Sequence, residues 1–533
     1  MTGRVNARSA LRLDLPPALA QSFHPRLAPR YSQGVRELLR RHRRFFLLFT
    51  LAGLALRVFF AVKFAHVTTD SLLYADIAKN WLTHGIYGQT DSGAIVPTLI
   101  RLPGYPAFLA IVFKLFGMEN YRAVITLQVI CDLGTCFLLA DAARRWFEKT
   151  KLGTIDDRPA QAAFALTALC PFLANYTAAV LTETLEVFFT ALALNFAIRG
   201  LFGTGLCGAD TLVREMPEQK AKPEFKPYLP WIAGGLATGA AILLRPDGGL
   251  LLAAIGAYLV IAFLLRNRKQ EIIAALVFSV ATLACLLPWT VRNSHTFGLF
   301  QPLAPRYANM PNDFVPHGFN HWTKTWIADY VSTEEFYWAE PGEELDVDKL
   351  PQRAFDSYQQ FQQTQDILDD YNTDHDLSPE LDARFEALAQ ERIQRSPFRY
   401  WVRLPLLRMA DMWLRPRTEL LPADTRWWEF DDGVFSAATS LGLGLLNLAY
   451  LLAAALGLAR LGSRKLGLPW HTAHYAALLL LFFALRTLFL GSLENPEPRY
   501  TLEAYPAVIL AAAACWRTRD QQSKTTEIRR SST

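Results

Sequence analysis

An apolar run and the polar segment directly after it set the architecture of this chain: FFLLFTLAGLALRVFFAVKFAH over residues 45–66, then TTDSLLY over residues 68–74. The run is long enough to cross the roughly 30 Å of hydrocarbon in a bilayer as a helix. Similar runs recur along the chain, so we expect an all-α polytopic membrane protein with about ten transmembrane helices, in a range of roughly 9–12. They are expected near 45–66, 122–143, 160–177, 183–203, 230–245, 248–265, 271–290, 434–460, 470–490 and 500–516.

Composition and charge agree with a membrane protein. Of the 533 residues, 51% are hydrophobic and only 19% are charged, which disfavours a soluble protein of this size. Residues 1–44 hold ten arginines and two acids, whereas residues 329–390 hold seventeen acids and three basic residues. This asymmetry indicates that the two regions lie in different compartments. The basic arm favours a positive-inside anchor over a nucleic-acid-binding segment.

A further apolar run, residues 105–116, is too short to cross the membrane and is expected to be a juxtamembrane or re-entrant helix. With this run excluded from the spans, the basic loops fall on the cytoplasmic side, including those with Arg144, Lys220, Arg266 and Arg464. Both termini are then cytoplasmic. The chain is predicted to be an integral protein of a bacterial inner (plasma) membrane, with its active site facing the periplasm or exterior.

This topology divides the chain into five regions. They are a basic cytoplasmic arm (1–44), an N-terminal transmembrane module (45–290) with the first outer loop at 67–121, a mostly helical outer-face domain (291–433), the C-terminal transmembrane helices (434–516) and a cytoplasmic tail (517–533). The outer-face domain has no cysteine, so it is not expected to need a disulfide. Its stretches 351–395 and 397–416 are predicted to be helical.

Carboxylates and arginines gather on the predicted outer face. They are Asp70, Asp76, Glu183, Glu186, Arg245, Asp247, Glu494, Glu497 and Arg499. Charges near the apolar phase are costly and mark candidate functional sites. A synthetic reaction outside the cytoplasm can use a donor carried on a lipid phosphate. Such a transfer needs a carboxylate to take the proton of the acceptor and positive groups to hold the phosphate.

Each of these residues also has a structural explanation. Asp70 could cap the helix predicted over residues 70–83, and Glu183 could be a first-turn acid favoured by a helix dipole. Arg245 and Arg499 could extend to the membrane interface. Arg57 and Arg486 lie within predicted spans and are expected to pair with buried carboxylates, and the acidic run 334–348 is expected to be a solvated face.

Three ordered motifs resemble the GT-C glycosyltransferases, in particular the bacterial members similar to protein O-mannosyltransferases and to the aminoarabinose transferase of lipid A. The first runs from Asp70 through Tyr74-Ala75-Asp76 and Gly85-Ile86-Tyr87 to Arg101-Leu102-Pro103-Gly104-Tyr105-Pro106. The second is Leu181-Thr182-Glu183-Thr184-Leu185. The third is Glu497-Pro498-Arg499-Tyr500 with Pro506. The resemblance covers residues 45–290 and 434–516, and only the end of the outer-face domain.

This resemblance implies an inverting transfer of a sugar from a polyprenyl-phosphate donor to a protein, lipid or glycan acceptor. Asp70 and Glu183 are then the catalytic candidates, with Glu183 supporting Asp70 or holding a divalent metal ion. The candidates for binding donor phosphate or substrate are Arg245, Arg499, Arg101, Asp76, Tyr500 and Glu494. Asp70 is followed by Ser71, where protein mannosyltransferases often have glutamate, so the donor and acceptor stay open.

Two other functions remain as alternatives. A polytopic transporter or lipid flippase could use the same charges as a pathway, and would be expected to show inverted repeats and charges near the middle of the bilayer. A non-catalytic assembly scaffold would tolerate the loss of Asp70.

Overall fold

The computed structural model describes residues 35–147, 156–203, 226–340, 342–431, 433–462 and 470–517. The chain divides into two compact units, residues 1–44 and 45–533. In the first unit the described part contains α1 (Val35–Arg41) and the start of α2. Most of the basic arm, nearly all of the 517–533 tail and the basic residues Lys220 and Arg464 lie outside the described residues.

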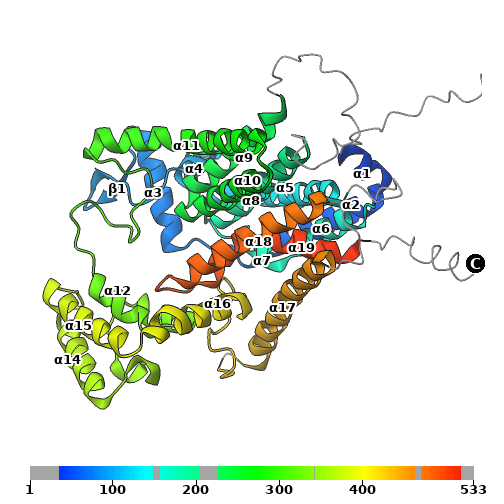
Figure 1. Ribbon diagram of the computed structural model, residues 1–533. Coiled ribbons are helices and arrows are strands. Elements are labelled where there is room, and N and C mark those ends of the chain that lie inside the picture. Colours follow the sequence, from blue (N-terminus) through cyan, green and yellow to red (C-terminus); the bar gives the residue numbers. More distant parts are fainter. Residues whose placement is uncertain are drawn as a thin grey trace, which may run out of the picture. The chain divides into compact units, whose positions relative to one another are not determined.

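Seven helices of the described chain are long and apolar enough to cross a membrane, and the protein is an integral membrane protein. Their bounds are α2 (Arg43–Lys63), α5 (Tyr121–Phe147), α8 (Glu183–Gly203), α10 (Gly249–Arg266), α11 (Lys269–Phe297), α17 (Val434–Gly462) and α18 (Trp470–Gly491) (Figure 1). The expected all-α polytopic fold class is confirmed.

The other three expected spans form shorter or broken helices. The run at 160–177 divides into α6 (Arg158–Ala168) and α7 (Pro171–Tyr176). The break falls before Pro171, because proline lacks the N–H group that would continue the hydrogen bonds of the helix. The run at 230–245 is the 16-residue α9 (Leu229–Leu244), only about 24 Å long at 1.5 Å per residue. The run at 500–516 begins with a 3-10 turn (Pro498–Ala504) before α19 (Tyr505–Ala513).

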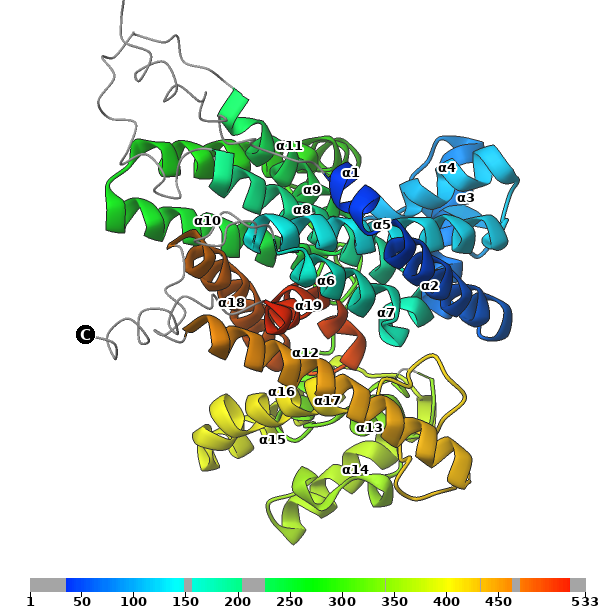
Figure 2. The same cartoon turned by 90° about the vertical axis from the view of Figure 1, so that its right-hand side faces the viewer.

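Close helix contacts hold the apolar bundle together. Helices α8, α9 and α11 run side by side in Figure 2 and contact one another through α9. At Gly235 of α9, a Cβ atom would lie 2.5 Å from the backbone oxygen of Phe278 in α11, so only glycine permits this approach. One large apolar core is shared by the described residues of seven helices: α5, α8, α9, α10, α17, α18 and α19.

The first loop contains both helix and strand. Helix α3 (Thr69–His84) is followed by the antiparallel pair β1 (Gly88–Asp91) and β2 (Ala94–Pro97), then by α4 (Gly104–Phe116). The short helix expected at 105–116 is therefore present, but the hairpin was not expected. Its turn has Ser92 and Gly93 at φ 48° and 84°, the left-handed backbone that tight hairpins require.

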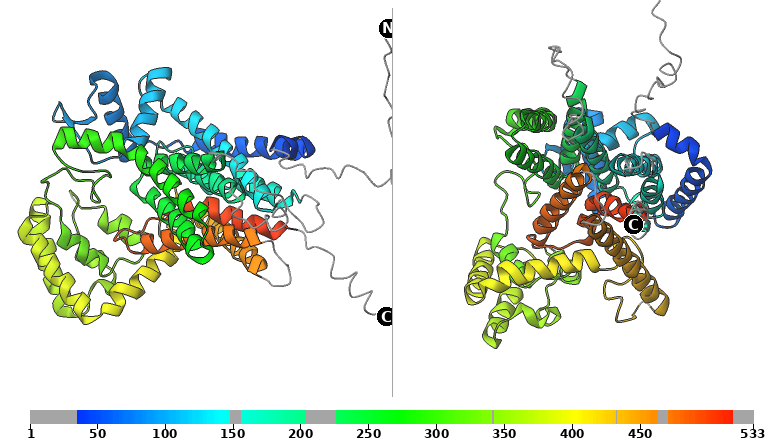
Figure 3. Two further views of the ribbon diagram at one scale, coloured as in Figure 1. Left: turned by 45° about the horizontal axis from the view of Figure 1, so that its top comes forward. Right: turned by 45° about the vertical axis from the view of Figure 1, so that its right-hand side comes forward.

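This loop is fixed to one end of α11. Arg292 of α11 donates hydrogen bonds to the backbone oxygens of Tyr87 at 2.6 Å and Thr98 at 2.7 Å. The rings of Tyr87 and Trp289 meet edge to face with centroids 5.0 Å apart. Figure 3 shows the first loop beside that end of α11. The segment that carries Asp70 is thus held by the bundle.

Residues 291–433 form a mostly helical domain. Its helices are α12 (His317–Lys324), α13 (Tyr330–Ser332), α14 (Tyr358–Asp374), α15 (Pro379–Arg395) and α16 (Leu404–Leu414), with π-helical turns at Thr333–Tyr337 and Arg399–Arg403 (Figure 1). Trp322, Trp326 and Phe385 are fully buried in its own aromatic core. The helices expected within 351–395 and 397–416 are confirmed.

Candidate active site

Asp70 lies in the first turn of α3 but does not cap it. Thr68 is the N-cap, and its side chain exchanges hydrogen bonds with Ser71 in a capping box. Each of these two side chains accepts from the backbone N–H of the other residue, so the N-terminus of α3 is capped without Asp70. The Asp70 side chain is 36% exposed, so its carboxylate is available for another contact.

Two arginines approach the Asp70 carboxylate, one at each oxygen. Arg101 Nη2 donates to Oδ1 at 3.0 Å, and Arg499 Nη2 lies 3.9 Å from Oδ2. Arg101 comes from the segment before α4, and Arg499 from the 3-10 turn before α19. The first and last motifs of the chain therefore meet at Asp70.

Glu183 lies behind these arginines. Its Oε1 is 3.9 Å from Arg499 Nη1 and 3.5 Å from Arg245 Nη1. Arg245 also lies over the ring of Tyr500, 4.5 Å from its centroid. Glu183 is 3% exposed, and its contacts fix the positions of the two arginines.

A cavity of about 650 Å³ lies on one side of Asp70. We call it the arginine cavity, because its polar wall contains Arg101, Arg245, Arg306 and Arg499. Its apolar wall includes Leu102, Leu244, Phe489 and Leu493. Positive groups facing an apolar wall suit an anion attached to a hydrocarbon chain.

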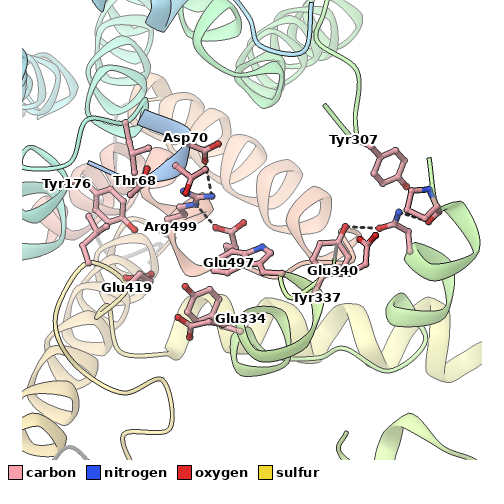
Figure 4. Close-up of a pocket in the computed structure, with 17 residues that line it drawn as sticks. Thr68, Asp70, Tyr176, Tyr307, Glu334, Tyr337, Glu340, Glu419, Glu497 and Arg499 are labelled. Carbon is pink, nitrogen blue, oxygen red and sulfur yellow. Dashed lines mark hydrogen bonds and ion pairs between the residues drawn. The ribbon is translucent and has the colours of Figure 1, made fainter. Parts of the chain in front are cut away.

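A second cavity of about 650 Å³ is also lined by Asp70. We call it the carboxylate cavity, because it is lined by Glu334, Glu340, Glu419 and Glu497. Figure 4 shows Asp70, Arg499 and Glu497 near its centre, with Tyr176 and Glu419 on one side and Tyr307, Tyr337 and Glu340 on the other. Four side chains line both cavities: Asp70, Tyr307, Tyr337 and Arg499.

A buried group of three carboxylates lies close to Glu183. It consists of Glu186, Asp247 and Glu503, with one oxygen of each within 4.8 Å of the others. The expected metal-holding residue was Glu183, whereas the residue in this group is Glu186. Both carboxylate oxygens of Glu186 lack a hydrogen-bond partner among the described residues, and a set of oxygen ligands suits a hard divalent cation.

The two buried arginines expected to pair with carboxylates do so. Arg57 Nη2 lies 2.5 Å from Asp132 Oδ2. Arg486 binds Asp247 at 2.9 Å and Glu503 at 2.6 Å, and it is itself fully buried. Neither arginine lines the two cavities.

The remaining expected binding residues divide into two groups. Glu494 and Tyr500 line the arginine cavity, where Glu494 accepts a 2.6 Å hydrogen bond from Arg306. Asp76 lies elsewhere: its carboxylate accepts from the backbone N–H of Thr90 at 2.6 Å and from the Thr90 hydroxyl at 3.0 Å. Asp76 therefore ties α3 to the hairpin and lines neither cavity.

Sequence reasoning missed the contribution of residues 291–433 to the site. The run 334–348 was expected to be a solvated face, but Glu334 and Glu340 line the carboxylate cavity together with Tyr337. Burial, with help from Asp376 and Asp382, raises the pKa of Glu340 to about 7. The only sequence signal was the concentration of acids with aromatics in TEEFYWAE, residues 333–340.

No protein-family model matches the chain, and no curated protein sequence matches it. Solved structures do match. The chain is similar to the archaeal oligosaccharyltransferase AglB from Archaeoglobus fulgidus, solved with an inhibitory peptide and a dolichol-phosphate, at 13% identity and a TM-score of 0.49. That match covers 89% of this chain and 50% of the other, so the chain spans about half the length of the oligosaccharyltransferase.

A second similar structure is ArnT from Cupriavidus metallidurans bound to undecaprenyl phosphate, at 15% identity and a TM-score of 0.36. The match covers 87% of this chain and 77% of ArnT. What each of the two solved proteins binds is a property of that protein.

Proposed function

We propose that this protein is a membrane-embedded glycosyltransferase that transfers a sugar from a polyprenyl-phosphate donor to an acceptor. The observation that carries the proposal is the position of Asp70, a carboxylate on the wall between an arginine-lined cavity and a carboxylate-lined cavity. A transfer between two substrates needs a proton-accepting group where they meet. Asp70 occupies that place.

The arginine cavity would take the donor. Its guanidinium groups would bind the phosphate through charge-assisted hydrogen bonds, and its apolar wall would contact the first prenyl units. As the bond to the sugar breaks, negative charge grows on the phosphate oxygen. Arg101 and Arg499, which already lie within 4 Å of Asp70, would stabilise that charge.

The carboxylate cavity would take the acceptor. Asp70 would accept the proton from the nucleophilic group of the acceptor as that atom forms a bond to the anomeric carbon of the sugar. The bond from the anomeric carbon to the phosphate oxygen breaks at the same time, and polyprenyl phosphate leaves. Attack from the side opposite the phosphate would invert the anomeric configuration of the sugar.

Glu183 acts on this reaction through Arg245 and Arg499, so it is a positioning residue. A divalent cation fits the neighbouring group of Glu186, Asp247 and Glu503, because carboxylates there outnumber the guanidinium groups of Arg245 and Arg486. Held there, the cation would supply positive charge beside the phosphate-binding arginines.

The topology predicted from the sequence supports a site outside the cytoplasm. The first loop and residues 291–433 both supply the cavities, and the positive-inside bias puts both of them opposite the basic loops. The five regions predicted from the sequence, with boundaries at 44, 290, 433 and 516, follow the same topology.

The test is a transfer assay with purified protein, a radiolabelled polyprenyl-phosphate sugar and candidate acceptors. We expect transfer by the wild type and a loss of at least about 100-fold in Asp70→Asn, since a general base contributes roughly 10²–10⁴-fold. Asp91→Asn is the matched control, because Asp91 is an exposed carboxylate of the same loop that lines neither cavity. Full transfer by Asp70→Asn would exclude the catalytic assignment.

A transporter or lipid flippase would behave differently in the same preparation. Reconstituted into vesicles, it would move the labelled lipid between leaflets without forming a product, and Asp70→Asn would alter that movement. A scaffold would show neither activity. Cysteine accessibility of residues 67–104 from the cytoplasmic side would contradict the topology.

A further inference from the structure

The carboxylate cavity has a charge that the transfer reaction alone does not require. Its lining contains Asp70, Glu334, Glu340, Glu419 and Glu497, against one basic side chain, Arg499. Arg499 is already engaged, since its Nε contacts Glu497 and its Nη2 faces Asp70. The rest of the cavity therefore has a negative potential that would attract a cation.

Glu334 and Glu340 form no ion pair with any described residue. The side chain of Glu419 is 9% exposed, and its nearest cationic atom, Arg417 Nη1, is 4.0 Å away. Its Oε1 has no hydrogen-bond partner within the described part of the chain. Glu334 is exposed, whereas Glu340 and Glu419 are partly or largely shielded from solvent, and a shielded carboxylate is costly to ionise unless a cationic ligand pairs with it.

The hydroxyl of Tyr176 provides a second, independent sign of a ligand. Tyr176 is 3% exposed and lines the cavity, and Figure 4 shows its hydroxyl pointing toward Glu419. It makes no hydrogen bond to any residue that the structure describes. Buried hydroxyls normally have a partner, and the cavity is where that partner would come from.

A metal ion is not the cation that this cavity fits. Within the described residues, the group of acidic side chains close enough to hold a metal is Glu186, Asp247 and Glu503, and none of these lines the carboxylate cavity. The carboxylates of the cavity are spread around a volume of about 650 Å³. Tyr330, Tyr337 and Trp338 add aromatic walls, which suit an organic cation.

The walls also favour a glycan over an extended peptide. A peptide in extended form is commonly bound along a free strand edge. The strands of the described chain are β1 and β2, and none of their residues lines this cavity. Carboxylates and tyrosine hydroxyls spaced around aromatic walls can instead form hydrogen bonds with the hydroxyl groups of a sugar chain.

We propose that the carboxylate cavity binds a glycan acceptor with a free, protonated amine, which pairs with Glu334, Glu340 and Glu419 while its hydroxyl groups contact Tyr176. This inference rests on the proposed function, because it identifies the class of acceptor that reaches Asp70. Binding of the acceptor to this cavity can be measured without knowing the donor.

The experiment is calorimetric titration of the full-length protein in detergent with two trisaccharides that differ only in the acetylation of their amines, a glucosamine trimer and its fully N-acetylated counterpart. We expect the free-amine form to bind about tenfold more tightly, the discrimination that two charge pairs of about 0.7 kcal/mol each supply. In Glu334→Gln/Glu340→Gln, the ratio of the two dissociation constants should fall to within about twofold. Glu380→Gln, an exposed acid of α15 outside both cavities, should keep the wild-type ratio.

Tyr176→Phe provides a second test. Because the Tyr176 hydroxyl has no partner among the described residues, its removal should leave the melting temperature unchanged or higher, while both trisaccharides bind about threefold to tenfold more weakly. Equal binding of the two trisaccharides to the wild type would overturn the inference. It would also be overturned if the protein bound a lysine peptide more tightly than its acetylated form but did not bind the glucosamine trimer. Loss of transfer by an otherwise amine-selective protein would refute only the proposed function.

Discussion

Replacing Asp70 by asparagine should separate donor binding from transfer. The substitution keeps the size of the side chain and removes the proton-accepting charge. The expected loss of roughly 10²–10⁴-fold in transfer rate corresponds to about 2.7–5.4 kcal/mol of transition-state stabilisation. The loss should appear in kcat with both substrates saturating.

Donor affinity should change in the opposite direction. In the wild type, Asp70 Oδ1 accepts a 3.0 Å hydrogen bond from Arg101, which neutralises part of the charge that the phosphate needs. The Asp70 carboxylate is 36% exposed, and pairs this exposed contribute about 0.2–1 kcal/mol. Releasing Arg101 should therefore strengthen phosphate binding by up to about fivefold.

The assay is titration of polyprenyl phosphate into the detergent-solubilised wild type, Asp70→Asn and Asp91→Asn. Transfer rates are measured on the same preparations, and melting temperatures establish that each variant is folded. If Asp70→Asn bound polyprenyl phosphate tenfold more weakly than the wild type, Asp70 would be a donor-binding residue, and its assignment as the base would be refuted.

Three further predictions concern stability, pH and metal. Arg57→Met should destabilise the protein by about 3–5 kcal/mol, because it leaves Asp132 buried without its partner. The double variant Arg57→Met/Asp132→Leu should recover part of this loss in thermal unfolding. If it recovers nothing, the broken ion pair is not the cause of the destabilisation. Glu340 keeps its proton up to pH about 7 in the folded protein but loses it near its ordinary pKa in the unfolded chain, so the stability of the wild type should fall as pH rises between these two values. Glu340→Gln should therefore have a higher melting temperature than the wild type at pH 8 but not at pH 4. Parallel curves of melting temperature against pH for the two proteins would contradict this. Mg²⁺ or Mn²⁺ should raise the melting temperature of the wild type but not of Glu186→Gln, and an equal rise in both would place the cation elsewhere.

The sequence predicts the structural features that are determined by residues close together along the chain. Long apolar runs predict the seven long helices, and the short run at 105–116 predicts α4, because hydrophobic length is a local property. The pairing of Arg57 with a carboxylate also follows, since a buried charge requires a partner. The break at Pro171 could have been predicted from the residue itself, but the surrounding run hid it.

The parts that the sequence does not predict depend on distant contacts. Asp76 matches a motif as well as Asp70 does, yet it accepts hydrogen bonds from Thr90 of the hairpin, and no local pattern distinguishes the two residues. Glu334 and Glu340 resemble any solvated acids until the fold places them in a cavity that is also lined by Asp70, more than 260 residues earlier in the chain. The choice of Thr68 and Ser71 over Asp70 as capping residues is likewise visible only in the hydrogen bonds.

The four side chains that line both cavities have a kinetic consequence. Since Asp70, Tyr307, Tyr337 and Arg499 line both cavities, the two cavities are separate spaces that two substrates can fill at the same time. In a transferase built this way, both substrates are present when the sugar moves, and the enzyme never carries the sugar alone. Double-reciprocal plots would then intersect, whereas an enzyme that alternates between two forms gives parallel lines.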